Sequence, residues 1–125
     1  MTEKKKKILI VDDDNDMLVL IRHFLRDADY EIVMTRRGDE ALQMVIDEVP
    51  DIALIDGLIP GIHGFELCEQ IKENKDIIRK PKIIIMSSVY KAQKYKFEVT
   101  EYKADDFLAK PFSKDQLLAK ISSLA

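Results

Sequence analysis

Acidic, hydroxyl and amine side chains follow four short apolar segments of this 125-residue chain. Clustered carboxylates repel one another unless a cation neutralises them, and carboxylate oxygens with open positions for water and phosphate are typical Mg²⁺ ligands. A carboxylate can also attack a phosphoryl group, a reaction that mainly requires in-line positioning and cations around the equatorial oxygens. These residue types predict a Mg²⁺-dependent phosphoryl-transfer site. Its candidate residues are Asp12-Asp13-Asp14, Asp56, Ser87-Ser88 and Lys110.

The elements that must position these residues alternate along the chain. Continuous apolar runs at 8–11, 52–55 and 83–86 are typical of strands buried on both faces. Five strand–helix units in strict alternation predict an α/β doubly wound fold with a parallel sheet. Ligands of such sheets bind beyond the carboxyl ends of the strands, where the polar residues fall. Further strands are expected at 31–35 and 107–109, and helices at 17–28, 38–46, 65–71, 91–102 and 117–121.

Composition limits the other possibilities. The 23 acidic and 20 basic residues give a net charge of −3, which argues against a general nucleic-acid binder. Cys68 is the only cysteine, so an internal disulfide and a cysteine-based zinc site are excluded. The apolar run after Lys4–Lys7 is too short for a signal peptide or a membrane span. We therefore expect one domain over residues 1–125, located in the cytoplasm and without a membrane partner.

Taken together, the motifs resemble those of the response-regulator receiver family of two-component signalling, over the whole chain. The segments that carry the resemblance are Ile-Leu-Ile-Val-Asp-Asp-Asp at 8–14, Asp51 to Asp56 with Pro60-Gly61 and Gly64, Met86-Ser87-Ser88, and Ala-Asp-Asp-Phe-Leu-Ala-Lys-Pro-Phe at 104–112. The resemblance implies a flavodoxin-like strand order of 2-1-3-4-5. It also implies phosphorelay signalling, with Asp56 accepting a phosphoryl group from a sensor histidine kinase or a histidine phosphotransfer protein.

The resemblance further implies the roles of the neighbouring residues. Mg²⁺ would be held by Asp13, Asp56 and the backbone carbonyl of Leu58, with Asp12 helping directly or through water. Ser87 and Lys110 would contact the phosphoryl group, and the peptide bond from Lys110 to Pro111 would be cis.

The resemblance also implies a switch. Phosphorylation would draw Ser87 inward and let the ring of Phe107 occupy the vacated space. This would bias the face formed by helix four, strand five and helix five, through which an unknown output partner would bind.

Some assignments remain open. Adjacent strand residues point to opposite faces, so Asp12 and Asp13 share a site only if the strand ends between them; otherwise they are helix N-caps. Asp14 is either a helix cap or a member of the acid cluster, and Ser88 is the alternative to Ser87. Leu58 and Val89 stand at positions that are often polar in the family, and predict a slowly decaying phosphorylated state.

Two other functions compete with a phosphorylated receiver. Asp12-x-Asp14 after a strand also resembles the first motif of haloacid-dehalogenase-type phosphatases, but Lys110 follows the acidic pair Asp105-Asp106 where that family has its lysine before it. A non-phosphorylated pseudo-receiver acting as a binding module is the second alternative. We expect no turnover of an external substrate.

We also expect Leu18 and Val19 to be exposed on the first helix and to contact the kinase or phosphotransfer helix. Whether the chain is a complete protein or a fragment stays open.

Overall fold

Five parallel strands form one sheet in the order β2-β1-β3-β4-β5 in the computed structural model, which describes residues 5–57, 63–88 and 104–124. The predicted flavodoxin-like α/β fold is confirmed. The predicted helix at 91–102 lies outside the described residues. The elements in chain order are β1 (Lys6–Val11), α1 (Asn15–Leu25), β2 (Tyr30–Thr35), α2 (Gly38–Glu48), β3 (Ile52–Asp56), α3 (Gly64–Glu73), β4 (Lys82–Ser88), β5 (Asp106–Lys110) and α6 (Lys114–Leu124).

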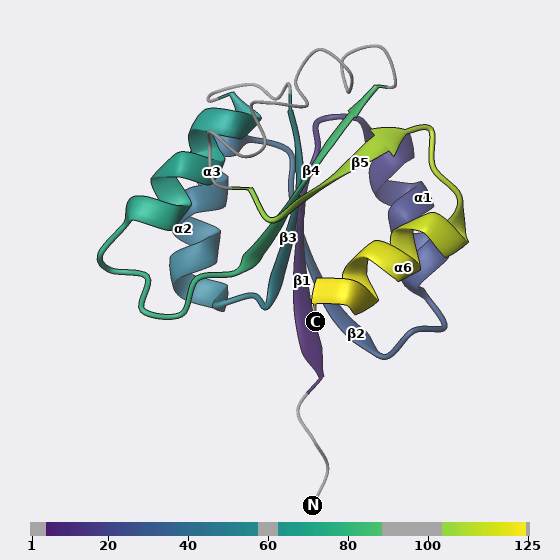
Figure 1. Cartoon of the computed structure of the whole chain (residues 1–125), viewed down its shortest axis with the longest axis horizontal. Helices are drawn as coiled ribbons and strands as arrows, with labels where there is room; N and C mark the ends of the chain where they lie inside the picture. Colours follow the sequence, from purple (N-terminus) through teal and green to yellow (C-terminus); the bar gives the residue numbers. More distant parts are fainter. Residues whose placement is uncertain (1–4, 58–62, 89–103, 125) are drawn as a thin grey trace, which may run out of the picture.

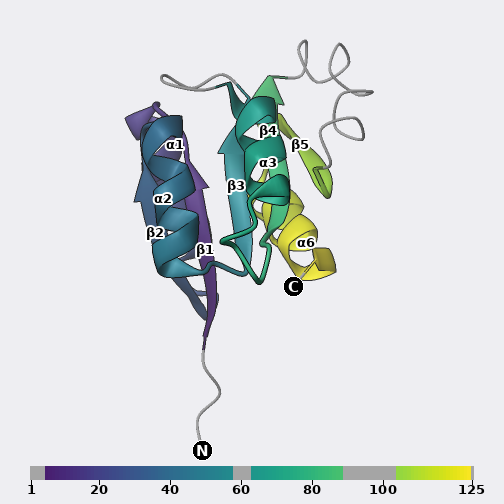
Figure 2. The ribbon, with the colours of Figure 1, turned by 90° about the vertical axis from the view of Figure 1, so that its left-hand side faces the viewer.

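Helices cover both faces of the sheet (Figure 1). α2 and α3 pack on one face over Leu9, Val11 and Ile55, and α1 and α6 pack on the other over Ile10 and Leu54. Because β1 and β3 lie inside the sheet, both faces of these strands are buried, which is why their sequences are continuously apolar. Burying each of these side chains stabilises the fold by about 2 kcal/mol. In the side view the strands run in parallel, so their carboxyl ends meet at one edge (Figure 2).

Helix α1 begins after Asp14, whose carboxylate accepts a hydrogen bond from the backbone N–H of Asp16 at 3.0 Å. Capping is therefore the role of Asp14, one of the two alternatives. The buried face of α1 contains Leu18, whereas Val19 is 68% exposed and Leu20 is 37% exposed. The prediction that Leu18 is exposed was wrong, whereas Val19 is exposed as predicted. Every residue from 17 to 21 is apolar, so hydrophobicity alone does not determine which of them faces the sheet.

The first residue of α3 lies directly against the backbone at the end of β3. The N–H of Gly64 donates to the carbonyl of Gly57 at 3.1 Å. A Cβ atom at position 64 would lie 2.2 Å from the carbonyl oxygen of Asp56 and 2.8 Å from the Cα of Gly57. Only glycine permits this approach, so Gly64 determines how closely α3 packs against Asp56.

Cys68 lies on the inner face of α3 and is fully buried. Burial raises the pKa of its thiol to about 12. The thiolate is the reactive form of cysteine, so this side chain acts as a small apolar residue in the folded protein.

The amino ends of β4 and β5 are held together by Asp105. Its Oδ2 accepts hydrogen bonds from the N–H of Ile83 and from Nζ of Lys72, both at 2.7 Å. Asp105 therefore stabilises the entry to β5. Within the described residues, no helix is long and apolar enough to cross a bilayer.

Candidate functional site

The loop between β1 and α1 carries two of the predicted acids. β1 ends at Val11, so both Asp12 and Asp13 follow the strand and are free of its alternation. Asp12 is fully buried; its N–H donates to the carbonyl of Thr35 at 3.2 Å, and its Oδ1 accepts from the N–H of Asp14 at 3.0 Å. Asp13 is exposed. The two acids can therefore share a site, although the strand ends before both of them rather than between them.

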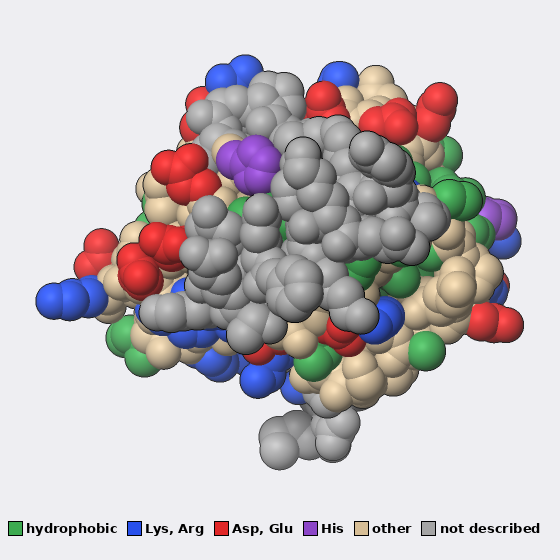
Figure 3. Space-filling view, turned by 45° about the horizontal axis from the view of Figure 1, so that its top comes forward, with side chains coloured by type: hydrophobic (Ala, Val, Ile, Leu, Met, Phe, Trp, Pro, Cys, Tyr) green, Lys and Arg blue, Asp and Glu red, His purple; other side chains and the backbone are tan. Residues whose placement is uncertain are grey.

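The carboxylates of Asp12, Asp13 and Asp56 form an acid trio whose nearest oxygens all lie within 4.8 Å of one another. Asp56 is the last residue of β3 and is half-buried. Figure 3 views the molecule obliquely from this edge, and acidic and basic side chains are both visible on the surrounding surface. The structure thus brings together the three acids that the sequence singled out, and leaves Asp14 outside the trio.

Lys110, the last residue of β5, places its ammonium beside the acid trio. Its Nζ lies 2.8 Å from Oδ2 of Asp12 and 3.6 Å from Oδ1 of Asp56. The three side chains are 19%, 0% and 14% exposed, respectively, so solvent screens these charges poorly. Among the residues that the structure describes, three carboxylates against one ammonium leave two negative charges in excess. This donor set fits a hard divalent cation such as Mg²⁺, which prefers oxygen ligands.

Ser87 and Ser88 occupy different environments at the end of β4. Ser87 is buried and Ser88 is exposed. Residues two apart on a strand point to the same face of the sheet, so the side chain of Ser87 lies on the same face as that of Ile85. Ile85 pairs with Phe107, and the side chains of Ile85 and Phe107 pack in the core under α2 and α3. Ser88 pairs with Lys110 across the two strands. Ser87 and Phe107 therefore lie on the same face of the sheet. The switch itself stays a prediction, and Ser88 remains a candidate for contact with the phosphoryl group.

The remaining predicted site residues can be placed only in part. The peptide bond between Lys110 and Pro111 is cis, as the resemblance implied. Leu58, whose carbonyl was assigned to the metal, and Val89 lie outside the described residues.

Comparison with known proteins identifies the fold and its family. The family model for the response regulator receiver domain matches residues 8–122. This chain is a receiver domain.

Individual relatives agree with the assignment to the receiver family. The phosphate regulon transcriptional regulatory protein PhoB of Rhizobium meliloti is 30% identical over 85% of this chain, which spans 46% of that protein. A response-regulator structure from Chloroflexus aurantiacus is 32% identical, with a TM-score of 0.88 over 97% of this chain and 98% of its own. The chemotaxis response regulator CheY4 of Vibrio cholerae is 27% identical, with a TM-score of 0.86 over 98% of this chain and 100% of its own. The receiver domain therefore spans less than half of its PhoB relative, and its general role is phosphorylation-based signalling.

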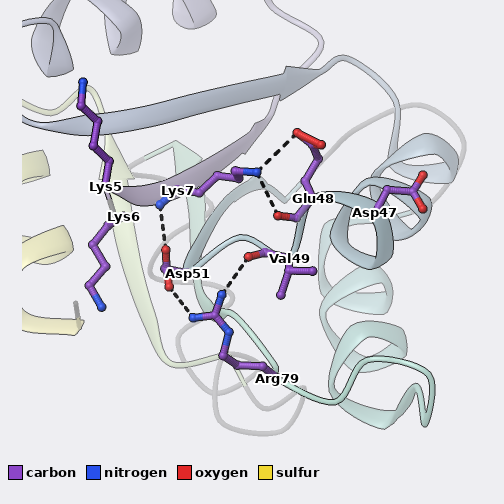
Figure 4. Close-up of a pocket in the computed structure, with 8 residues that line it drawn as sticks. All are labelled: Lys5, Lys6, Lys7, Asp47, Glu48, Val49, Asp51 and Arg79. Atoms are coloured by element: carbon purple, nitrogen blue, oxygen red, sulfur yellow. Dashed lines mark hydrogen bonds and ion pairs between the residues drawn. The ribbon is translucent and has the colours of Figure 1, made fainter. Parts of the chain in front are cut away.

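A second charged region of the receiver domain lies at the opposite, amino-terminal edge of the sheet (Figure 4). Here a cavity of about 600 Å³ is lined by basic and acidic side chains. Arg79 contacts Asp51 at 2.6 Å and the carbonyl of Val49 at 3.1 Å, and Nζ of Lys7 contacts the carbonyl of Glu48 at 3.1 Å. Burial alone would raise the pKa of Asp51. The hydrogen bond from the N–H of Lys7 and the contact with Arg79 outweigh burial and hold the pKa below its usual value. This network joins β1, α2 and β3, so we interpret it as structural.

Two residues that support the receiver site were not recognised from sequence as doing so. Thr35 is buried at the end of β2 and its carbonyl accepts a hydrogen bond from the N–H of Asp12. This contact depends on the parallel pairing of Val11 with Thr35, which no local feature of the sequence reveals. Gly64 was noted only as part of a motif, and its close approach to Asp56 depends on the packing of α3.

Proposed function

We propose that this receiver domain accepts a phosphoryl group on Asp56 in a Mg²⁺-dependent reaction. The observation that carries the proposal is the position of the Lys110 ammonium between Asp12 and Asp56, beside three carboxylates that share one small volume. A half-buried carboxylate with a neighbouring amine fits a nucleophile whose transition state is stabilised by positive charge.

The reaction needs little beyond positioning. An oxygen of Asp56 forms a bond to phosphorus while the bond to the leaving group breaks, and the leaving group departs with the electron pair. Lys110 neutralises charge on the phosphoryl oxygens, and a hydroxyl of Ser87 or Ser88 donates a hydrogen bond. When bound to Asp12, Asp13 and Asp56, Mg²⁺ would supply two further positive charges, which balance the excess negative charge of the site.

Labelling with a small phosphodonor tests this function. Wild-type protein is incubated with acetyl phosphate in Mg²⁺ or in EDTA and analysed by intact mass, then by borohydride reduction and peptide mapping. One phosphoryl group, on Asp56 and only in Mg²⁺, is expected. An unlabelled protein would favour the pseudo-receiver, and sustained turnover of a generic phosphate ester would favour the phosphatase.

Mg²⁺ should also stabilise the folded protein in the absence of phosphate. At ten times its Kd, a ligand that binds only the folded state adds about 1.4 kcal/mol, which corresponds to a rise in Tm of roughly 5 °C. Thermal unfolding with Mg²⁺ and with EDTA measures this rise. It should disappear in Asp13→Asn; an equal rise in that variant would place the cation elsewhere.

The donor is proposed to be a histidine kinase or a phosphotransfer protein that contacts α1. Val19 is the most exposed apolar side chain of this helix, and Leu18 takes no part because it is buried. Val19→Glu should slow transfer from a kinase that labels the wild type by roughly tenfold, a typical effect at a contact, while labelling by acetyl phosphate is unchanged. Ile78, 97% exposed in the connection between α3 and β4, provides the control variant Ile78→Glu, which should leave both rates unchanged. Equal slowing of both reactions by Val19→Glu would contradict docking at this position.

The output is proposed to depend on Ser87 and Phe107. An aspartyl phosphate adds negative charge and acceptor oxygens that draw the Ser87 hydroxyl, and Phe107 lies on the same face to respond. The partner surface would consist of segment 91–102, β5 and α6. Because its PhoB relatives are transcriptional regulatory proteins, we propose a transcriptional output for a longer protein that contains this domain. No direct nucleic-acid contact is proposed for the receiver domain itself.

A further inference from the structure

Arg36 reaches from the end of β2 to the loop that carries the acid trio. Its Nη2 donates a hydrogen bond of 3.2 Å to the backbone carbonyl of Asp13, a residue 23 positions earlier in the chain. Thr35, the residue before it, is buried and is already bonded to Asp12 through its carbonyl. The backbone of Arg36 is therefore fixed beside the loop that follows β1. Its long side chain spans the distance from there to the backbone carbonyl of Asp13.

The loop is held at three successive residues. Asp12 is buried and paired with Lys110, and Asp14 caps α1. Asp13 lies between them with an exposed carboxylate, and the bond from Arg36 holds its backbone carbonyl. Since the Asp13 side chain projects from a backbone restrained by that bond, the restraint acts on the direction of its carboxylate.

We propose that Arg36 is a positioning residue for Asp13, holding its carboxylate toward Asp12 and Asp56 and so raising the affinity of the acid trio for Mg²⁺. The inference rests on the proposed Mg²⁺ site. Outer groups that orient metal ligands commonly contribute to metal affinity. The positive charge of Arg36 acts in the opposite direction, because it repels a cation. This side chain is exposed, so salt and solvent screen its charge, and the geometric effect predominates.

Arg37 offers a matched control. It is adjacent, carries the same charge, and bonds through Nε and Nη2 to the two carboxylate oxygens of Asp39 at 2.9 and 3.0 Å. Its side chain has no cap hydrogen bond at the start of α2. Substitution of Arg37 therefore removes a nearby charge without removing the bond to the Asp13 loop.

The test is a Mg²⁺ titration of wild type, Arg36→Lys, Arg36→Gln and Arg37→Gln, followed by the amide NMR shifts of residues 12–14 and 56. Arg36→Lys keeps the positive charge but loses the planar guanidinium that donates to the carbonyl of Asp13. Arg36→Gln loses the positive charge, and its shorter side chain also loses the bond to Asp13. Both variants should bind Mg²⁺ about fivefold more weakly, the effect of one lost hydrogen bond, and Arg37→Gln should stay close to wild type. Unchanged affinity in Arg36→Lys with tighter binding in Arg36→Gln would show that only charge acts, and would overturn the proposal.

A second readout separates positioning from a general loss of stability. Thermal unfolding in EDTA should be the same for all four proteins. The rate of labelling by acetyl phosphate should fall in the Arg36 variants at low Mg²⁺ and return to the wild-type rate at saturating Mg²⁺. Failure of wild type to bind Mg²⁺ would overturn the proposed function itself. Binding that Asp13→Asn abolishes and Arg36 variants leave unchanged would overturn only the positioning role.

Discussion

Asp56→Asn should lose phosphorylation by acetyl phosphate completely, with a rate at least roughly a thousandfold below wild type, equivalent to about 4 kcal/mol in the barrier. The amide is neutral and a poor nucleophile, while the ammonium of Lys110 and the other two acids stay in place. The substitution also removes one of the three mutually repelling carboxylates of the acid trio, so stability in EDTA should be equal to wild type or higher. Intact mass over time and urea unfolding measure the two effects.

Asp39→Asn is the control for this result. Asp39 is an exposed acid at the start of α2, paired with Arg37 and outside the acid trio. Its labelling should match that of wild type. A phosphoryl group that moves to another residue in Asp56→Asn, at a similar rate, would show that Asp56 is not the intended acceptor.

Gly64→Ala should both destabilise the protein and slow its phosphorylation. The added Cβ would lie 2.2 Å from the carbonyl oxygen of Asp56, a backbone atom that cannot rotate away. Either α3 moves outward or the end of β3 shifts. Forced overpacking of this kind costs about 3 kcal/mol. A displacement of Asp56 by about 1 Å would slow transfer by up to a hundredfold, because in-line attack depends on position.

Gly57→Ala is the matched comparison for stability. A Cβ at position 57 would meet its nearest neighbours, Met86 and Phe65, at 3.6 and 3.7 Å, which is ordinary contact. Urea midpoints should therefore fall far more for Gly64→Ala than for Gly57→Ala. Similar midpoints, with a wild-type labelling rate for Gly64→Ala, would mean that α3 does not pack against Asp56 as closely as the structure indicates.

The fold was predictable because the central strands are buried in the same apolar surroundings on both faces. Residues 8–11 and 52–55 are buried on both faces, so a continuous apolar run is both necessary and diagnostic. Helix α1 shows where this reasoning ends. Its apolar residues from 17 to 21 point in every direction around the helix axis, and the burial of Leu18 instead of Leu20 follows from how α1 sits on the sheet. That orientation is a tertiary property that local periodicity does not contain.

The site was predictable to the extent that strand ends determine it. Asp56 and Lys110 terminate parallel strands, so their convergence follows from the topology alone. The difference between Asp12, fully buried, and Asp13, exposed, does not follow from two identical adjacent side chains. It arises from the bond between Asp12 and Thr35 on a neighbouring strand. The contact of Arg36 with Asp13 was invisible for the same reason: side chains 23 residues apart meet only after β1 and β2 have paired.

The buried thiol of α3 provides a chemical probe for the detachment of this helix from the sheet. Cys68 is the chain's only cysteine, so any thiol reagent reports on one position without engineering. With a thiol pKa of about 12 and no exposure, the folded form should be inert to iodoacetamide at pH 8, and the alkylation rate should be proportional to the fraction of molecules in which α3 has detached from the sheet. If α3 leaves only on complete unfolding, the free energy from labelling will equal that from urea. Faster labelling would reveal that the helix packed against Asp56 opens independently of the rest of the fold.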